Sequence, residues 1–166
     1  MCHADHSGET RPWLSSPTRM NSSDRDSSIR PTLSAAQARR IVDDAVTQAM
    51  AMSVPVTVAV VDESGVIKEF KRMDGAPLAS VQTAVSKAYA AAALGMPPDE
   101  FFTGIESDPA AVVSYMNCPG LVYIAGGLPL VVDGEVAGAV GVAGATTAAE
   151  DRRIAQVAVE GRGASS

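Results

Sequence analysis

The sequence predicts an α+β protein built on a five-stranded antiparallel sheet. Three observations lead to this fold class. Neighbouring strand-like segments are joined by short turns, and helix-like segments lie between these groups of strands. The length of 166 residues is sufficient for one domain with a hydrophobic core. The expected order is helix, two strands, helix, two short helical turns, three strands and a final helix.

The first part of the chain shows no periodic pattern of hydrophobic residues. Residues 1–31 are rich in Ser, Asp and Arg, so we expect a disordered N-terminal tail followed by a single domain over 32–164. Cys2, His3 and His6 are metal-binding residue types. No metal site is predicted there, because no fold fixes their geometry.

The domain begins with a helix and two strands. A helix is predicted over 34–52, because Ser34 and Gln37 form a capping box and apolar residues recur on one face. The segment 56–61 is apolar on both faces, which predicts a central strand covered on each side. The segment 66–73 is more polar and suits an edge strand.

The middle of the chain is mainly helical. We expect a helix over 78–94, short helical turns over 99–105 and 109–115, and a strand over 121–125.

The last part of the chain is predicted to form a β-hairpin and a helix. Two β-branched strands lie on either side of Asp133-Gly134, a pair that favours a type I′ turn. A helix over 147–160 follows, and Thr147 with Glu150 forms its capping box.

Charge and hydropathy limit the partners and the location. The net charge is −6, and the tail contributes none of it because its acidic and basic residues are equal in number. This acidity argues against a nucleic acid or anionic membrane partner, and no apolar run is long enough to span a membrane. The N-terminus lacks the apolar core of a signal peptide, and Cys2 and Cys118 make no disulfide framework, so we expect a cytoplasmic protein.

A polar stripe follows the second turn of the domain. Arg72 and Asp74 flank that turn, and Lys87 lies on the small-residue face of the next helix with Ser80 and Thr83. Arg72 and Lys87 are candidates to hold a carboxylate or phosphate, with the two hydroxyls as hydrogen-bond partners.

The alternative for the same stripe is structural. A buried Lys87 needs a partner, and Asp74 or Asp62 would provide one in an ordinary ion pair.

Two glycine-rich turns are further candidates. The amides of Gly144, Ala145 and Thr146 precede a helix and could receive an anion, although the residues of a P-loop are missing. Gly126 and Gly127 mark either a bulge or a gap left for a ligand or a neighbouring subunit. The alternative for both turns is tight backbone packing.

Histidine is absent from residues 7–166, which excludes His-dependent triads and His metal clusters from the domain. Cys118 is either a thiolate nucleophile, a soft metal ligand or an inert side chain. Met73 and Met116 suit the core, although a thioether can also ligate haem iron.

Several blocks occur in a familiar order: VAVVDESG at 58–65, RMDGAP at 72–77, Ser80 with Lys87 and Ala88, GGLPL at 126–130, and GAVGV at 138–142. Over 33–160 the chain resembles the GlcG/HbpS family, the haem-degrading domains that also form the C-terminal part of PduO-type proteins. The resemblance implies a profilin-like α/β/α sandwich, dimers or higher oligomers, and haem or corrinoid binding in some members. Histidine-ligated haem does not fit this chain, because its domain contains no histidine.

Two functional hypotheses follow, and a third is a structural or regulatory subunit without a ligand. The first is a cytoplasmic homo-oligomeric protein that binds haem or another tetrapyrrole, with propionates or phosphates held by Arg72, Lys87 and amides near Gly144. The second is an enzyme acting on a small carboxylated metabolite, with Lys87 or Asp74 as acid or base and Arg72 as anion clamp. The site proposed in both hypotheses requires residues 72–87 and 126–147 to lie close together in the fold.

Overall fold

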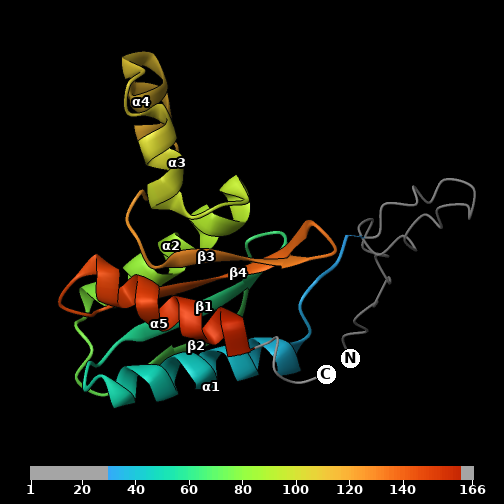
Figure 1. The fold of residues 1–166 in the computed structure, drawn as a ribbon, viewed down its shortest axis with the longest axis vertical. Coiled ribbons are helices and arrows are strands. Elements are labelled where there is room, and N and C mark those ends of the chain that lie inside the picture. The colour runs from blue at the N-terminus through green and yellow to red at the C-terminus, as the bar shows by residue number, and fades with distance from the viewer. Residues whose placement is uncertain (1–29, 162–166) are drawn as a thin grey trace, which may run out of the picture.

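A computed structural model describes residues 30–161, so the predicted tail lies outside the described residues except for its last two positions. Figure 1 shows a sheet with helices on both faces and a helical hairpin that projects from the body. The elements are α1 (Ala35–Ala51), β1 (Thr57–Asp62), β2 (Ile67–Arg72), α2 (Ala79–Leu94), α3 (Pro98–Ile105), α4 (Pro109–Met116), β3 (Gly127–Val132), β4 (Glu135–Ala143) and α5 (Ala148–Glu160).

The sheet has four strands in the order β2-β1-β4-β3, and every neighbouring pair is antiparallel. The prediction of a fifth strand over 121–125 was wrong. Pairing with β4 starts only at Gly126, whose carbonyl accepts a hydrogen bond from the Val142 amide at 2.9 Å. The left-handed φ of Gly126, +114°, turns the chain there, so the preceding apolar residues run beside the helical hairpin rather than along the sheet.

The two faces of the sheet pack in different ways. On one face α1 and α5 cover a layer of larger side chains that includes Val58, Val60 and Val140. On the other face α2 lies against Ala59 and Ala139 through its own alanines. The fold therefore has three layers, with helices on both faces of the sheet. This arrangement confirms the prediction that β1 is a central strand covered on each side.

Local signals in the sequence set several element boundaries. Both predicted capping boxes are present, at the starts of α1 and α5. Asp133 and Gly134 have φ angles of +52° and +83°, as a type I′ turn requires. The outer strand β2 is largely exposed, which confirms the edge position expected for it.

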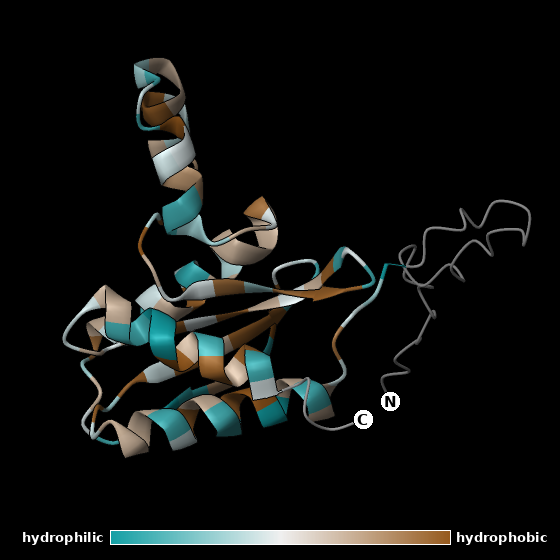
Figure 2. Cartoon of the chain, viewed as in Figure 1, coloured by the Kyte–Doolittle hydropathy of each residue, from teal (hydrophilic) through white to brown (hydrophobic). Residues whose placement is uncertain are grey.

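The hairpin formed by α3 and α4 stands apart from the three layers (Figure 1). Its helices touch each other and α2, and Phe101 packs edge to face on Tyr115 with ring centres 4.8 Å apart. Figure 2 shows apolar residues along this hairpin, and several of them, including Val113 and Met116, are exposed. Among the described residues, no helix combines the length and the apolar character that crossing a bilayer needs.

Candidate functional site

The buried charge of the fold is an ion pair between α2 and α5. The Lys87 side chain is 1% exposed, and its Nζ donates to Asp151 Oδ2 at 2.7 Å and to the Val142 carbonyl at 3.0 Å. The expectation that Lys87 needs a partner is met by Asp151, not by Asp74 or Asp62. Asp62 instead accepts hydrogen bonds from amides of its own turn.

Gly126 makes room for this pair. A Cβ at that position would lie 2.9 Å from Lys87 Nζ and 2.7 Å from the Val142 carbonyl oxygen. A Cβ on the adjacent Gly127 would likewise collide with the backbone carbonyl of Lys87. The space that these glycines leave is therefore filled by α2 and its lysine, in line with the packing alternative.

Asp151 is the site residue that sequence reasoning missed. Its Oδ1 accepts from the Ala145 amide at 3.0 Å, so the carboxylate joins the loop before α5 to the lysine of α2. A signal was present: Asp151 falls three and four positions before Ile154 and Ala155, on the inward face of its helix. An acidic residue on a buried helix face requires a buried cation.

A hollow of about 290 Å³ opens beside the ion pair, and we call it the Lys87 hollow. It joins the start of α2, the end of β4 and the start of α5, so these parts of 72–87 and 126–147 do meet. The predicted residues in its wall are Ser80, Thr83, Lys87, Gly144, Ala145 and Thr146; the others are Pro77, Ala79, Ile124, Ala143, Thr147, Ala148 and Asp151.

Arg72 and Asp74 lie outside this hollow. The guanidinium of Arg72 folds back on its own turn, where Nε and Nη2 donate to the Ala76 carbonyl. Asp74 is exposed in the same turn. Both positions follow from β2 being an edge strand, because a side chain at the rim of the sheet faces water rather than the helix α5.

A second hollow, of about 380 Å³, is apolar and lies at the base of the helical hairpin. We call it the apolar hollow; its wall consists of Phe102, Met116, Leu121, Val122, Tyr123 and Ile124. Ile124 lines the Lys87 hollow as well, so the two hollows are neighbours.

Tyr123 is the polar group in the apolar hollow. Its hydroxyl donates to the Tyr115 carbonyl at 2.7 Å. Burial, and to a smaller extent the nearby Cys118 and Tyr115, raises the pKa of Tyr123 above its usual value. This shift disfavours the phenolate form of Tyr123.

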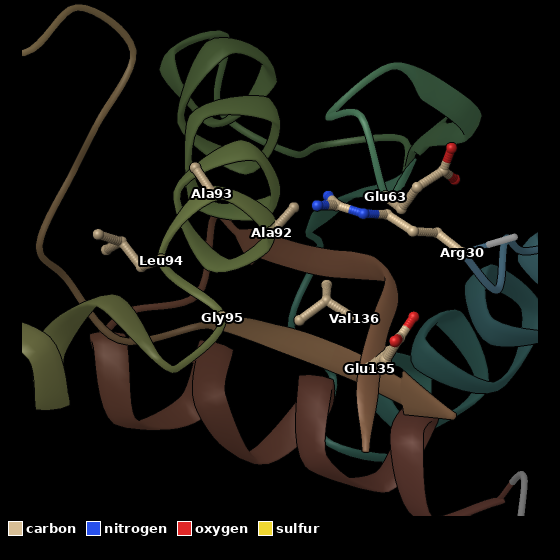
Figure 3. Close-up of a pocket in the computed structure, with 8 residues that line it drawn as sticks. All are labelled: Arg30, Glu63, Ala92, Ala93, Leu94, Gly95, Glu135 and Val136. Atoms are coloured by element: carbon tan, nitrogen blue, oxygen red, sulfur yellow. The ribbon is translucent and has the colours of Figure 1, made fainter. Parts of the chain in front are cut away.

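A third hollow, of about 400 Å³, lies by the end of α2 and the β3–β4 turn (Figure 3). Arg30 reaches across it towards Ala92, while Glu63 and Glu135 stand at its rim. None of the site residues predicted from the sequence lines this hollow. In residues 30–161, moreover, no cluster of three or more His, Cys, Asp or Glu side chains could hold a metal.

Comparison with known proteins decides the family. A model of the family described as "Haem degrading protein HbpS-like" matches residues 33–160. The chain belongs to the HbpS-like family. The resemblance noted from the sequence blocks is thereby confirmed, although the family alone assigns no chemistry to the three hollows.

Three relatives of this HbpS-like chain are informative. An uncharacterized 15.0 kDa protein from the dhaT-dhaS intergenic region of Citrobacter freundii is 32% identical over 130 residues, covering 78% of this chain and 91% of the relative. The crystal structure of Klebsiella pneumoniae ORFY has a TM-score of 0.76 and 27% identity, covering 90% of this chain and all of ORFY. The crystal structure of a PduOC:haem complex has a TM-score of 0.70 and 29% identity, covering 78% of this chain and 94% of PduOC.

Proposed function

We propose that this HbpS-like chain is a ligand-binding protein for haem or a related tetrapyrrole, and that the macrocycle sits in the apolar hollow. The observation that carries the proposal is the wall of that hollow, made of aromatic and aliphatic side chains and a thioether. Such a wall favours a large, flat and mostly apolar ligand. The likeness to a solved haem complex supports the same choice.

The residues that line the apolar hollow fit haem, because Met116 offers a thioether as an iron ligand. Met116 lines the apolar hollow, and the residue is 52% exposed. Tyr123 is a poorer donor, because its hydroxyl is engaged and its raised pKa disfavours the phenolate. When bound, haem would supply a redox-active iron whose potential depends on the side chains that ligate it.

The geometry gives no support to Arg72 and Lys87 as the propionate clamp expected from the sequence. The positive charge of Lys87 is cancelled by Asp151, and Arg72 donates to its own turn outside the hollows. We infer that the propionate edge of the ligand stays in water at the rim of the apolar hollow. Corrinoids are a second ligand class to test, since the same wall would accept their apolar face.

The oligomeric state and the cytoplasmic location stay predictions. Exposed apolar side chains on the projecting hairpin, Val113 and Met116 among them, support a homo-oligomer. The enzyme hypothesis with Asp74 as acid or base finds no support in the geometry, because Asp74 is exposed outside the Lys87 hollow.

Titration with haemin tests the proposal. We expect a Soret band that saturates at one haemin per chain and survives gel filtration. Ile124→Asp places a charge in the wall and should weaken binding about tenfold or more. Met116→Ala should shift the absorption bands by removing the thioether.

The matched control is Val66→Asp, which adds the same charge at an exposed position outside the hollow; Val66 is 61% exposed. It should leave haemin affinity unchanged. Equal weakening by both aspartates would mean nonspecific adsorption of haemin and would overturn the proposal.

A further inference from the structure

We propose that the outer edge of β2 pairs with the same edge of a second copy of this chain, so that two four-stranded sheets join into one continuous sheet. The contact is a two-fold antiparallel pair centred on Phe70. Three features of β2 carry the inference: an edge with unpaired backbone groups, an apolar strip that α2 leaves largely uncovered, and an order of charges that fits one register. The inference does not depend on haem binding.

The first feature is the free edge of β2. The strand is the outer one of the sheet, next to β1, and its burial pattern is exposed at all but one position. The Met73 amide donates to the Val56 carbonyl at 2.9 Å, and hydrogen-bonded positions alternate along an antiparallel pair. The backbone groups of Phe70 and Arg72 therefore point away from β1. Within residues 30–161 β2 pairs with no other strand, so these outward groups are a template for one.

The second feature is an apolar strip on the α2 side of β2. Phe70 pairs with Ala59, whose side chain packs against α2, so the phenyl ring lies on that same face. Ile67 is opposite Val61 and lies there as well. Because α2 packs on β1, β3 and β4, Phe70 stays 37% exposed and Ile67 49% exposed. Pairing with a second copy places two phenyl rings opposite each other, a contact that stabilises antiparallel strands.

The third feature is the order of charges on the other face of β2. Glu69 is opposite Val60, so its side chain lies on the α1 side of the sheet. Lys71 lies on the same side, with its Nζ 4.0 Å from Asp43 Oδ1 of α1. In a pair centred on Phe70, Glu69 lies opposite Lys71 of the second copy, at a non-hydrogen-bonded position where side chains come closest. The two-fold axis repeats this ion pair, so one strand supplies both partners of each contact.

Other two-fold registers are unfavourable. Outward backbone groups recur at every second residue, so the axis passes through a residue rather than between two. Centring on Glu69, Lys71 or Arg72 would place two identical charges directly opposite each other, which is destabilising. The charges that repel these registers therefore select the one centred on Phe70.

The remaining cations of β2 are turned back onto their own chain. Lys68 occupies the irregularity in the pairing with β1, and its Nζ lies 3.9 Å from Asp62 Oδ2. Arg72 donates to the Ala76 carbonyl. Lys68 and Arg72 would face each other across the proposed pair, and these contacts within each chain reduce their repulsion.

Light scattering and sedimentation of the full chain without haem test the pairing. Glu69→Lys and Lys71→Glu each replace two attractive contacts by two repulsive ones, so each should raise the dissociation constant of the β2 contact about tenfold or more. A mixture of the two variants should associate again, because each supplies the charge that the other has lost. A role of either residue within its own chain alone does not produce this recovery.

The matched control is Glu160→Lys, which changes the net charge by the same amount at an exposed position at the end of α5. It should leave the association unchanged. A second readout is amide exchange with deuterium. The amides of Phe70 and Arg72 should exchange slowly in the associated chain and faster in either reversal variant.

Three outcomes would overturn the proposal. The first is a molar mass of one chain at every concentration. The second is an assembly that both reversals leave intact, since its contact would lie on another surface. The third is weakening by Glu160→Lys equal to that by Glu69→Lys, which would show only an effect of net charge.

Haemin titration keeps this proposal separate from the haem proposal. No residue of β2 lines the apolar hollow, so both reversal variants should bind haemin as the unmodified chain does. Failure of haemin binding in the unmodified chain would leave the association tests unaffected.

Discussion

Lys87 shows how one side chain couples distant parts of the chain. It arises from an alanine-rich helix and meets Asp151, which is 64 residues away in the sequence. Its burial could be expected from the small residues around it, and so could its need for a partner. The identity of the partner depended on how α5 packs across the sheet, which no local pattern specifies.

Removing one partner of this pair should be costly. Lys87→Met leaves the Asp151 carboxylate buried without its cation, and we expect the free energy of unfolding to drop by roughly 3–5 kcal/mol. Urea denaturation measures the loss. Adding Asp151→Leu should recover much of it, because replacing both charges by apolar groups avoids the unpaired carboxylate; a double variant less stable than Lys87→Met would contradict this account.

Gly126 is expected to resist substitution for steric reasons. Gly126→Ala combines a left-handed φ of +114° with a Cβ within 2.9 Å of Lys87 Nζ and Asp151 Cβ, and should cost several kcal/mol of stability. Gly134→Ala is the control, since its φ is +83° but no atom lies within 4 Å of the added Cβ. It should cost about 1 kcal/mol. Similar melting temperatures for the two variants would show that the close contacts at Gly126 contribute nothing to the loss of stability.

At the scale of elements, local patterns predicted most helices and strands. Capping residues located the starts of α1 and α5, and the continuous apolar run of β1 indicated its central position. The segment 121–125 was misassigned because an apolar run suits a strand as well as the wall of a hollow. Only the tertiary arrangement, with the α3–α4 hairpin beside it, distinguishes the two.

The α3–α4 hairpin should be the least protected element. Within the described residues it contacts α2, the segment 121–125 through Tyr123 and, through Arg152 with Asp99 and Glu100, α5. We expect its amides to exchange with deuterium much faster than those of β4, which pairs on both sides. Hydrogen exchange followed by mass spectrometry tests this, and protection of α4 equal to that of β4 in the isolated chain would contradict it. Slower exchange on adding haemin would place the ligand on the hairpin.

At the scale of the whole molecule, the fold brings two unlike hollows together on either side of Ile124. Part of this site was predictable: Ser80, Thr83, Lys87 and the turn after β4 do converge. Arg72 and Asp74 were included in the predicted site because they are close in sequence to Ser80 and Lys87. They lie outside the Lys87 hollow because β2 is at the edge of the sheet. The apolar hollow itself was not anticipated, since it needs side chains from α3, α4 and the irregular segment before β3.

The central claim is that a tetrapyrrole occupies the apolar hollow. Backbone NMR spectra recorded during titration with ferric haemin test it directly, because the paramagnetic iron broadens signals of nearby amides. We predict broadening at Phe102, at Met116 and over 121–124, with signals around Arg30, Glu63 and Glu135 unaffected. Broadening centred on Glu63 and Glu135, or none at the apolar hollow, would contradict the account.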